Sequence, residues 1–370
     1  MIVLNSGIGN YINLNNKRYS FFAGNNYLGL ANHPVLIKAA KDAITKYGVN
    51  FSGSRQTTGT SELHLELEKL ISEFKGKKDS VIFASGYMGN RIILQTLSGR
   101  YSALFIDEHS HPSIPDGIPS NIKDVFSYKH CDPGHLEILL KKNKKSRPLI
   151  ISDGIFALTG EIAPLDKIYP LAEKYHAILV IDDAHSTGIL GENGRGTPEY
   201  FNLGKFPDIY QSETMSKALG VYGGFISGDR EIINEIREKS TAYMASTSLP
   251  PPLVAAGCSS MKILKKQPGL RIIALENAKL IREGVKSLNY KTSEDNTPII
   301  PIFFSSQKKA IYLSEFLKDK GIIVPYVNYP VKIDKYIVRI TASATHSNYQ
   351  IEELLTALKK WRNKHAAGKD

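Results

Sequence analysis

The feature that most constrains the fold of this chain is the alternation of short apolar runs with longer amphipathic segments. Apolar runs that predict buried β-strands cover residues 80–84, 103–106, 149–152, 178–181, 209–212 and 224–226. Between them, residues 63–74 and 166–175 carry apolar side chains at helical spacing. This order predicts an α/β fold in which a mainly parallel sheet is flanked by helices.

The pattern changes after about residue 230, which predicts a second structural region. Residues 231–239 are charged with helical spacing, residues 299–304 and 336–341 read as strands, and residues 351–361 form a closing amphipathic helix. A chain of 370 residues is long enough for more than one domain. We expect an N-terminal segment over 1–40, a large domain over 41–230 and a smaller α+β domain over 231–370.

The charge balance and the cysteine content limit the classes of partner and compartment. The net charge of +11 is compatible with nucleic acid or with anionic ligands such as phosphate and coenzyme A. The positive residues are spread widely and no nucleic-acid-binding motif is present, so we expect no nucleic acid partner. No apolar run approaches the roughly 18 residues of a membrane span. Cys131 and Cys258 are too few for a disulfide framework or a cysteine-based metal site, and we expect a cytoplasmic protein without a metal.

Polar residues at two predicted strand ends point to a specific chemistry. The apolar run 177–181 leads into Asp182 and His185, and the run 209–212 leads towards Lys217. A carboxylate for a pyridinium nitrogen, an imidazole and a lysine that can form a Schiff base are what pyridoxal phosphate (PLP) requires. Each residue alone reads more simply as an ordinary surface group, but their order in the chain favours a PLP enzyme.

Two further turns follow predicted strands and could contact the same cofactor. Gly86 and Tyr87 lie where the strand 80–84 gives way to a helix, a junction whose backbone N–H groups can bind a phosphate. His109 and His111 follow the strand 103–106, at the edge where ligands of such sheets gather. One of these rings could stack on a flat cofactor.

Four motifs carry a resemblance to a known family, and they span nearly the whole N-terminal half and centre of the chain. They are FAGNNYLGL at 22–30, GSRQTTGT at 53–60, DDAHSTG at 182–188 and GENGRG at 191–196. In these motifs the chain resembles the α-oxoamine synthases, which are fold-type I PLP enzymes. Members of that family condense an amino acid with an acyl thioester and release carbon dioxide. Within the family the chain is most similar to members of the biotin pathway.

The resemblance implies a role for each residue around the cofactor. Lys217 would bind PLP covalently and then act as acid and base. Asp182 would pair with the pyridine nitrogen, His185 would hydrogen-bond the phenolic oxygen, and His111 would stack on the ring.

It also implies contacts to the phosphate and to the substrate. The backbone at Gly86 and Tyr87 and the hydroxyl of Thr214 would hold the phosphate. Thr247 would reach it from the partner subunit, because active sites of this family lie at the interface of a homodimer. The two substrate contacts implied are Arg339, as the clamp for the amino-acid carboxylate, and Asn26, facing the same group.

The implied reaction joins L-alanine to a pimeloyl thioester carried by coenzyme A or by acyl carrier protein. Glycine with acetyl-CoA and serine with a long-chain acyl thioester are alternatives within the family. A PLP aminotransferase or lyase of the same fold, and a non-catalytic binding protein, are alternatives outside it. The chain has Ala157 where the family commonly has Ser, which predicts altered hydrogen bonding near the phenolic oxygen.

Overall fold

The computed structural model describes residues 3–203 and 209–366 and divides into two compact units. The larger one, which we call the sheet unit, comprises His33–Phe156 and Ile162–Gln267. The other, which we call the terminal unit, comprises Met1–Asn32, Ala157–Glu161 and Pro268–Asp370. Each unit is described by itself below, and the expected domain boundaries at residues 40 and 230 stay a prediction.

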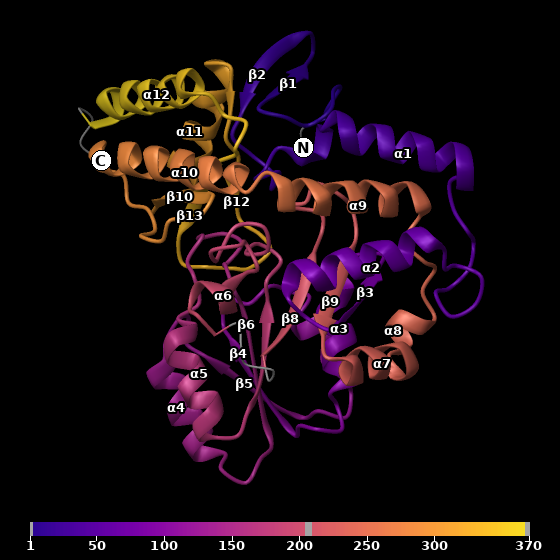
Figure 1. Ribbon diagram of the computed structural model, residues 1–370. Helices are drawn as coiled ribbons and strands as arrows, with labels where there is room; N and C mark the ends of the chain where they lie inside the picture. Colours follow the sequence, from indigo (N-terminus) through magenta and orange to yellow (C-terminus); the bar gives the residue numbers. More distant parts are fainter. Residues whose placement is uncertain (1–2, 204–208, 367–370) are drawn as a thin grey trace. The chain divides into compact units, whose positions relative to one another are not determined.

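A seven-stranded sheet forms the centre of the sheet unit, with the strand order β3-β9-β8-β7-β6-β4-β5 (Figure 1). Its strands are β3 (Asp79–Phe83), β4 (Ala103–Asp107), β5 (Asp124–Tyr128), β6 (Pro148–Asp153), β7 (Ile178–Asp182), β8 (Ile209–Thr214) and β9 (Gly224–Gly228). Strand β9 runs antiparallel to both of its neighbours, and the other pairs are parallel. The predicted mainly parallel sheet is therefore confirmed, as are its six predicted strands.

Strand β5 was not predicted because most of its residues are exposed, unlike those of β3 at the other edge of the sheet. Three of its five residues are exposed, including Asp124, and only Tyr128 is buried. An edge strand with one covered face lacks the continuous apolar run of the central strands.

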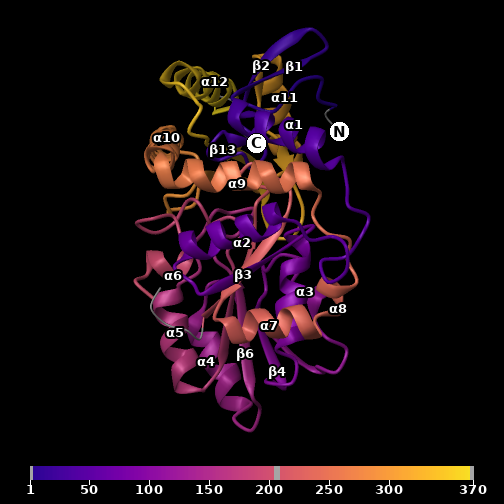
Figure 2. The same ribbon diagram turned by 45° about the vertical axis from the view of Figure 1, so that its right-hand side comes forward.

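Alternate side chains of each central strand enter cores on opposite faces of the sheet. In β4, Leu104 and Ile106 pack with one set of helices, whereas Ala103 and Phe105 pack with another. The first set is α3 (Tyr87–Thr96), α7 (Arg230–Lys239) and α8 (Thr241–Met244), and the second is α4 (Pro133–Lys142) and α5 (Leu165–Lys174). Figure 2 shows α7 beside the sheet near α3 and α8. Both faces are thus covered, as a central parallel sheet requires.

Four further helices of the sheet unit are α1 (Pro34–Tyr47), α2 (Glu62–Lys75), α6 (Thr197–Tyr200) and α9 (Pro251–Lys266). One of them, α2, packs on β3 and β9. Helix α9 contacts both α1 and α2 (Figure 1). A capping box in which Ser61 and His64 exchange hydrogen bonds begins α2.

Two small sheets and three long helices build the terminal unit. The antiparallel sheet β10-β13-β12 contains β10 (Ile299–Phe304), β12 (Tyr326–Val327) and β13 (Tyr336–Thr341), and the second sheet contains β1 (Tyr11–Leu14), β2 (Lys17–Phe21) and β11 (Ile322–Ile323). Helices α10 (Gly269–Ser287), α11 (Gln307–Asp319) and α12 (Asn348–Ala366) supply apolar residues to one core with β10 and β13. A short 3-10 turn, η1 (Leu30–Asn32), ends the N-terminal part. Within the described ranges, no helix is long and apolar enough to cross a membrane.

Candidate active site

A cavity of about 210 Å³ lies where β7 and β8 end in the sheet unit. Ligands of open α/β sheets bind at the carboxyl ends of the strands, so its position suits an active site. Seven of the ten residues proposed from the sequence line it: Gly86, Tyr87, His111, Asp182, His185, Thr214 and Lys217. These residues come from four separate chain segments, and the fold brings them together.

Asp182, the last residue of β7, is a buried carboxylate whose described partners are neutral. Its Oδ2 accepts a hydrogen bond from Asn90 Nδ2 at 2.6 Å, and its Oδ1 accepts one from the backbone N–H of Ala184 at 3.0 Å. No described residue forms an ion pair with it. A buried charge without a counter-charge is costly unless a ligand supplies one. A protonated pyridine nitrogen would supply that charge, so Asp182 fits PLP.

Four other buried charges of the sheet unit form ion pairs within the protein. Lys75 and Glu213 form an ion pair in which both side chains are completely buried. Arg55 and Glu68 form a second buried pair at 2.7 Å. Asp182 differs from these four residues, because its hydrogen-bond partners are neutral and no described residue forms an ion pair with it.

A chain of hydrogen bonds runs from Asp182 to the ring of His111. Asn90 donates its second amide hydrogen to Ser113 Oγ at 2.8 Å, and that hydroxyl lies 2.7 Å from His111 Nδ1. Burial lowers the pKa of His111, the Asp182 charge opposes this shift, and Lys217 adds to it. The ring is therefore neutral near pH 7 and held in one orientation, as stacking on a cofactor requires.

Asp153, at the end of β6, lines the same cavity beside Asp182. Its Oδ2 accepts the backbone N–H of His111 at 3.0 Å. Burial raises the pKa of Asp153 well above its ordinary value, and the charge of Asp182 raises it further. Two adjacent buried carboxyl groups cannot both ionise easily, and burial together with the neighbouring charge favours the neutral form of Asp153.

The turn before α3 approaches the end of β8 closely and forms a cradle for an anion. Gly86 is the N-cap of α3, and a Cβ at this position would lie 2.5 Å from the Thr214 side chain. The Thr214 hydroxyl donates to the carbonyl of Gly223 at 3.0 Å and accepts from the N–H of Ser216 at 3.2 Å. Only glycine permits this approach, and the N-terminal N–H groups of α3 favour a phosphate.

Tyr87 and Lys217 complete the lining of the cavity. The Tyr87 hydroxyl donates to Asp116, and its ring meets His111 edge-on with ring centres 5.8 Å apart. Lys217 follows β8 by three residues and is partly buried in the cavity wall. Its charge contributes to the pKa shifts of both His111 and Asp153, which line the same cavity.

The three other proposed residues do not line this cavity. Thr247 is exposed and forms an isolated bridge with Ser54. Asn26 and Arg339 belong to the terminal unit, where Asn26 Oδ1 accepts the backbone N–H of Ala31 at 3.1 Å. Their proposed roles stay predictions.

Arg339 lies in β13 and is buried. Its described hydrogen-bond partners are all neutral. Its Nε donates to the carbonyl of Ala157 at 2.7 Å, Nη1 to the Thr341 hydroxyl at 2.9 Å and Nη2 to Asn25 Oδ1 at 3.0 Å. A longer bond of 3.3 Å joins Nη1 to the carbonyl of Gly24. Asn25, the neighbour of Asn26 in the chain, therefore contacts this guanidinium.

Sequence reasoning missed Asn90, Ser113 and Asp153. Asn90 is a polar residue four positions after Gly86, on the buried face of α3, and that placement was an available signal. Asp153 ends a fully buried strand, as Asp182 does. Ser113 offered no separate signal, because a serine two residues after a histidine is common in turns.

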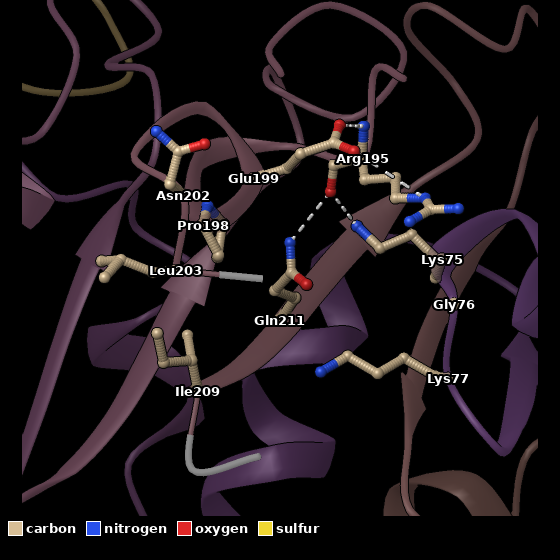
Figure 3. Close-up of a pocket in the computed structure, with 10 residues that line it drawn as sticks. All are labelled: Lys75, Gly76, Lys77, Arg195, Pro198, Glu199, Asn202, Leu203, Ile209 and Gln211. Carbon is tan, nitrogen blue, oxygen red and sulfur yellow. Dashed lines mark hydrogen bonds and ion pairs between the residues drawn. The ribbon is translucent and has the colours of Figure 1, made fainter. Parts of the chain in front are cut away.

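A second, larger cavity of about 370 Å³ lies at the opposite end of β8 (Figure 3). Its lining includes Ile209, the first residue of that strand, and Lys75. Figure 3 shows Lys75 and Gln211 directed at the backbone oxygen of Arg195, to which both donate hydrogen bonds. Because its buried lysine is already paired and its position is at the amino ends of the strands, this cavity is not the candidate active site.

Comparison with known proteins identifies the class to which the fold and cavity belong. The chain belongs to the aminotransferase class I and II family, whose description matches residues 21–358. PLP is its cofactor, and the protein is an enzyme of the α-oxoamine synthase type, an acyltransferase.

Individual relatives narrow this class. An 8-amino-7-oxononanoate synthase of Thermoanaerobacter pseudethanolicus is 39% identical over 363 residues, which cover 97% of this chain and 92% of the relative. The 8-amino-7-oxononanoate synthase 2 of Bacillus subtilis is 36% identical, covering 97% and 90%. Among solved structures, a serine palmitoyltransferase from S. paucimobilis with a bound PLP–myriocin aldimine matches with a TM-score of 0.93 and 28% identity, covering 98% of this chain and 92% of that one.

The position of Lys217 predicts a covalent label. Borohydride reduction of the purified yellow protein should fix one PLP per chain on the peptide that contains Lys217, because this lysine shares the cavity with Asp182. Peptide mapping by mass spectrometry measures the site. Lys75 and Lys77, which line the second cavity, serve as internal controls and should remain unlabelled. A label on either of them would contradict the assignment.

Proposed function

We propose that the enzyme condenses L-alanine with a pimeloyl thioester and releases carbon dioxide and a free thiol. The product would be 8-amino-7-oxononanoate, an intermediate of biotin synthesis. Support comes from the 8-amino-7-oxononanoate synthases that match nearly the full length of the chain at 36–39% identity. The observation that carries the chemistry is the buried Asp182, which shares one cavity with Lys217 and His111.

The proposed roles of the cavity residues follow from their charges. When bound, the cofactor withdraws electrons from Cα of the amino acid and so makes its bonds easier to break. Asp182 would hold a proton on the ring nitrogen by accepting its N–H. Lys217 would first bind the cofactor and then, once released, take the proton from Cα. The neutral His111 ring would hold the cofactor flat, and His185 would donate to its phenolic oxygen.

Arg339 is proposed to bind the carboxylate of the amino acid. Its guanidinium is buried and no described carboxylate forms an ion pair with it. Its guanidinium donates to Ala157, Gly24, Thr341 and Asn25, also hydrogen-bonds the Tyr27 hydroxyl, and its bond to the Gly24 carbonyl is long at 3.3 Å. A carboxylate could take the place of this weak neutral partner, and arginine can bind a carboxylate through two N–H groups.

The assembly and the acyl carrier are part of the same proposal. We propose a cytoplasmic homodimer in which Thr247 reaches the phosphate of the partner's site. Its exposure in the single chain supports this role, because a residue that acts across an interface must face outward. The acyl group would arrive on coenzyme A or on acyl carrier protein, and the net charge of +11 favours either anionic carrier.

Serine with a long-chain acyl thioester is the second candidate reaction, because serine palmitoyltransferases are among the matching structures with a TM-score of 0.93. A matrix of alanine, glycine and serine against pimeloyl, acetyl and palmitoyl thioesters separates the candidates. We expect the fastest thiol release with alanine and the pimeloyl thioester, with one carbon dioxide per thiol. Fastest release with serine and palmitoyl-CoA would replace the proposal, and keto-acid formation without thiol release would indicate an aminotransferase.

The role of Arg339 predicts a selective loss of amino-acid affinity. Arg339→Lys keeps the positive charge but loses the two-pronged geometry, so alanine binding should weaken by about 2 kcal/mol, near thirtyfold in Kd. Titration of the cofactor absorbance with alanine measures this Kd.

Arg282→Lys is the matched control. Arg282 is also buried in the terminal unit, but it donates to the carbonyls of Ser293, Thr297 and Ile299 and therefore ties a loop. This variant should lower the melting temperature without changing the Kd for alanine. An unchanged Kd in Arg339→Lys, or equal losses in both variants, would show that Arg339 is structural.

A further inference from the structure

Asp107, His130 and Cys131 form a group of side chains outside the cofactor cavity, which we call the thiol cluster. Asp107 ends β4, and the other two residues follow β5, the neighbouring edge strand. His130 Nδ1 lies 2.9 Å from Asp107 Oδ1, and Cys131 Sγ lies 3.7 Å from His130 Nε2. Cys131 is thus a possible nucleophile, His130 a base beside it, and Asp107 a carboxylate that orients the base. The proposed reaction uses none of these three residues.

The carboxylate of Asp107 is fixed in place and determines which nitrogen of His130 carries the proton. It is buried, its Oδ1 accepts the backbone N–H of His109 at 2.8 Å, and its Oδ2 accepts that of Cys131 at 2.9 Å. Because an ionised carboxylate can only accept hydrogen bonds, His130 Nδ1 must be the donor. The lone pair of Nε2 then faces the sulfur of Cys131.

The ring of His130 and the backbone of Cys131 are held rigidly. His109 packs on the ring with centres 4.2 Å apart, and Phe156 meets it edge-on at 4.3 Å. Cys131 has a φ of 50°, in the left-handed region that Asn adopts far more readily than Cys. Its hydrogen bond to Asp107 maintains this conformation, which directs the sulfur back towards His130.

We propose that Cys131 is a thiol-modification site of this protein, activated by His130 and reactive towards soft electrophiles, disulfides in particular. His130 Nε2 takes the proton from Sγ, and the thiolate attacks one sulfur of the disulfide. The S–S bond of the reagent breaks, a mixed disulfide forms at Cys131, and the second sulfur leaves as a thiolate. Cys131 is oxidised and the leaving thiol is reduced, so the reagent itself supplies the oxidising equivalents.

The second cysteine provides an internal reference. Cys258 lies in α9, is buried and contacts the carbonyl of Leu63 at 3.7 Å. Burial, with a smaller contribution from Glu66, raises the pKa of its thiol to about 12. Cys131 is partly exposed and has an imidazole beside it, so the native protein should show one reactive thiol of two.

The test is the reaction of the full-length native protein with 5,5′-dithiobis(2-nitrobenzoate), followed by the release of thionitrobenzoate from pH 5.5 to 10. We expect one fast equivalent per chain, located on Cys131 by peptide mapping. The midpoint of its pH–rate profile should lie below about 7.5, compared with about 8.5 for an ordinary thiol. The proposal is overturned if the midpoint lies at 8.5 or higher, or if Cys258 reacts first.

Two variants separate activation from simple accessibility. Cys131→Asn should abolish the fast equivalent and keep the melting temperature, because Asn tolerates the left-handed backbone. His130→Asn should slow the reaction about tenfold at pH 6.5 and return the midpoint towards 8.5, while the rate at pH 10 stays close to that of the wild type. A faster reaction of His130→Asn at every pH would show that His130 only shields the sulfur, and would overturn the proposal.

A bound metal is the competing explanation for these side chains, because their ligand atoms lie within 4.8 Å of one another. A thiol that reacts only after EDTA treatment would indicate a metal ligand and overturn the proposal. An equal rate with and without EDTA supports it. If His130→Asn does not fold, the pH profile of the wild type decides alone. None of these measurements depends on the substrates, so their outcome is independent of the proposed function.

Discussion

The site depends on how three carboxyl groups coexist at one edge of the sheet. Asp107, Asp153 and Asp182 end the neighbouring strands β4, β6 and β7, and all three are buried. Three adjacent buried negative charges would be prohibitively costly. Asp107 is stabilised by His130 and by backbone N–H groups, and burial raises the pKa of Asp153, which favours its neutral form. Asp182 is left as the charge that a ligand can neutralise. For this reason Asp182, and not Asp107 or Asp153, is the candidate partner of the cofactor.

The same distinction separates structural charges from charges available to ligands elsewhere in the chain. Asp183, next to Asp182, is completely buried, and its oxygens accept from the Thr197 backbone and hydroxyl and from Gln211. It therefore fixes the segment that follows β7, although it is chemically identical to its neighbour. Arg339 is a buried positive charge whose described hydrogen-bond partners are all neutral, as those of the negatively charged Asp182 are. An acid and a base left uncompensated in this way suit a cationic ring and an anionic substrate group.

The sequence predicted those parts of the fold that depend on local periodicity and on motifs. The six predicted strands and the helix at 63–74 carry a clear apolar pattern, whereas β5 does not, because one of its faces is exposed. Lys217, Asp182 and Gly86 could be proposed because their residue types and order match a known chemistry. The Asn90–Ser113–His111 chain could not, because it depends on which buried polar groups meet after folding. For the same reason the contact of Asn25 with Arg339 could not be predicted, nor could the thiol cluster, in which Asp107 meets residues 23 and 24 positions further along the chain.

The central claim is that the charge of Asp182, and not merely a carboxyl-sized group, activates the cofactor. The most direct measurement is the exchange of the alanine Cα proton for deuterium, followed by NMR in the absence of acyl thioester. Asp182→Asn should retain PLP but slow the exchange by several orders of magnitude, because the ring nitrogen loses the charge that keeps it protonated. Asp153→Asn is the matched control. Since the raised pKa of Asp153 favours its neutral form, this variant should exchange within about tenfold of the wild type. Comparable exchange in Asp182→Asn and the wild type, or an equal loss in both variants, would contradict the account.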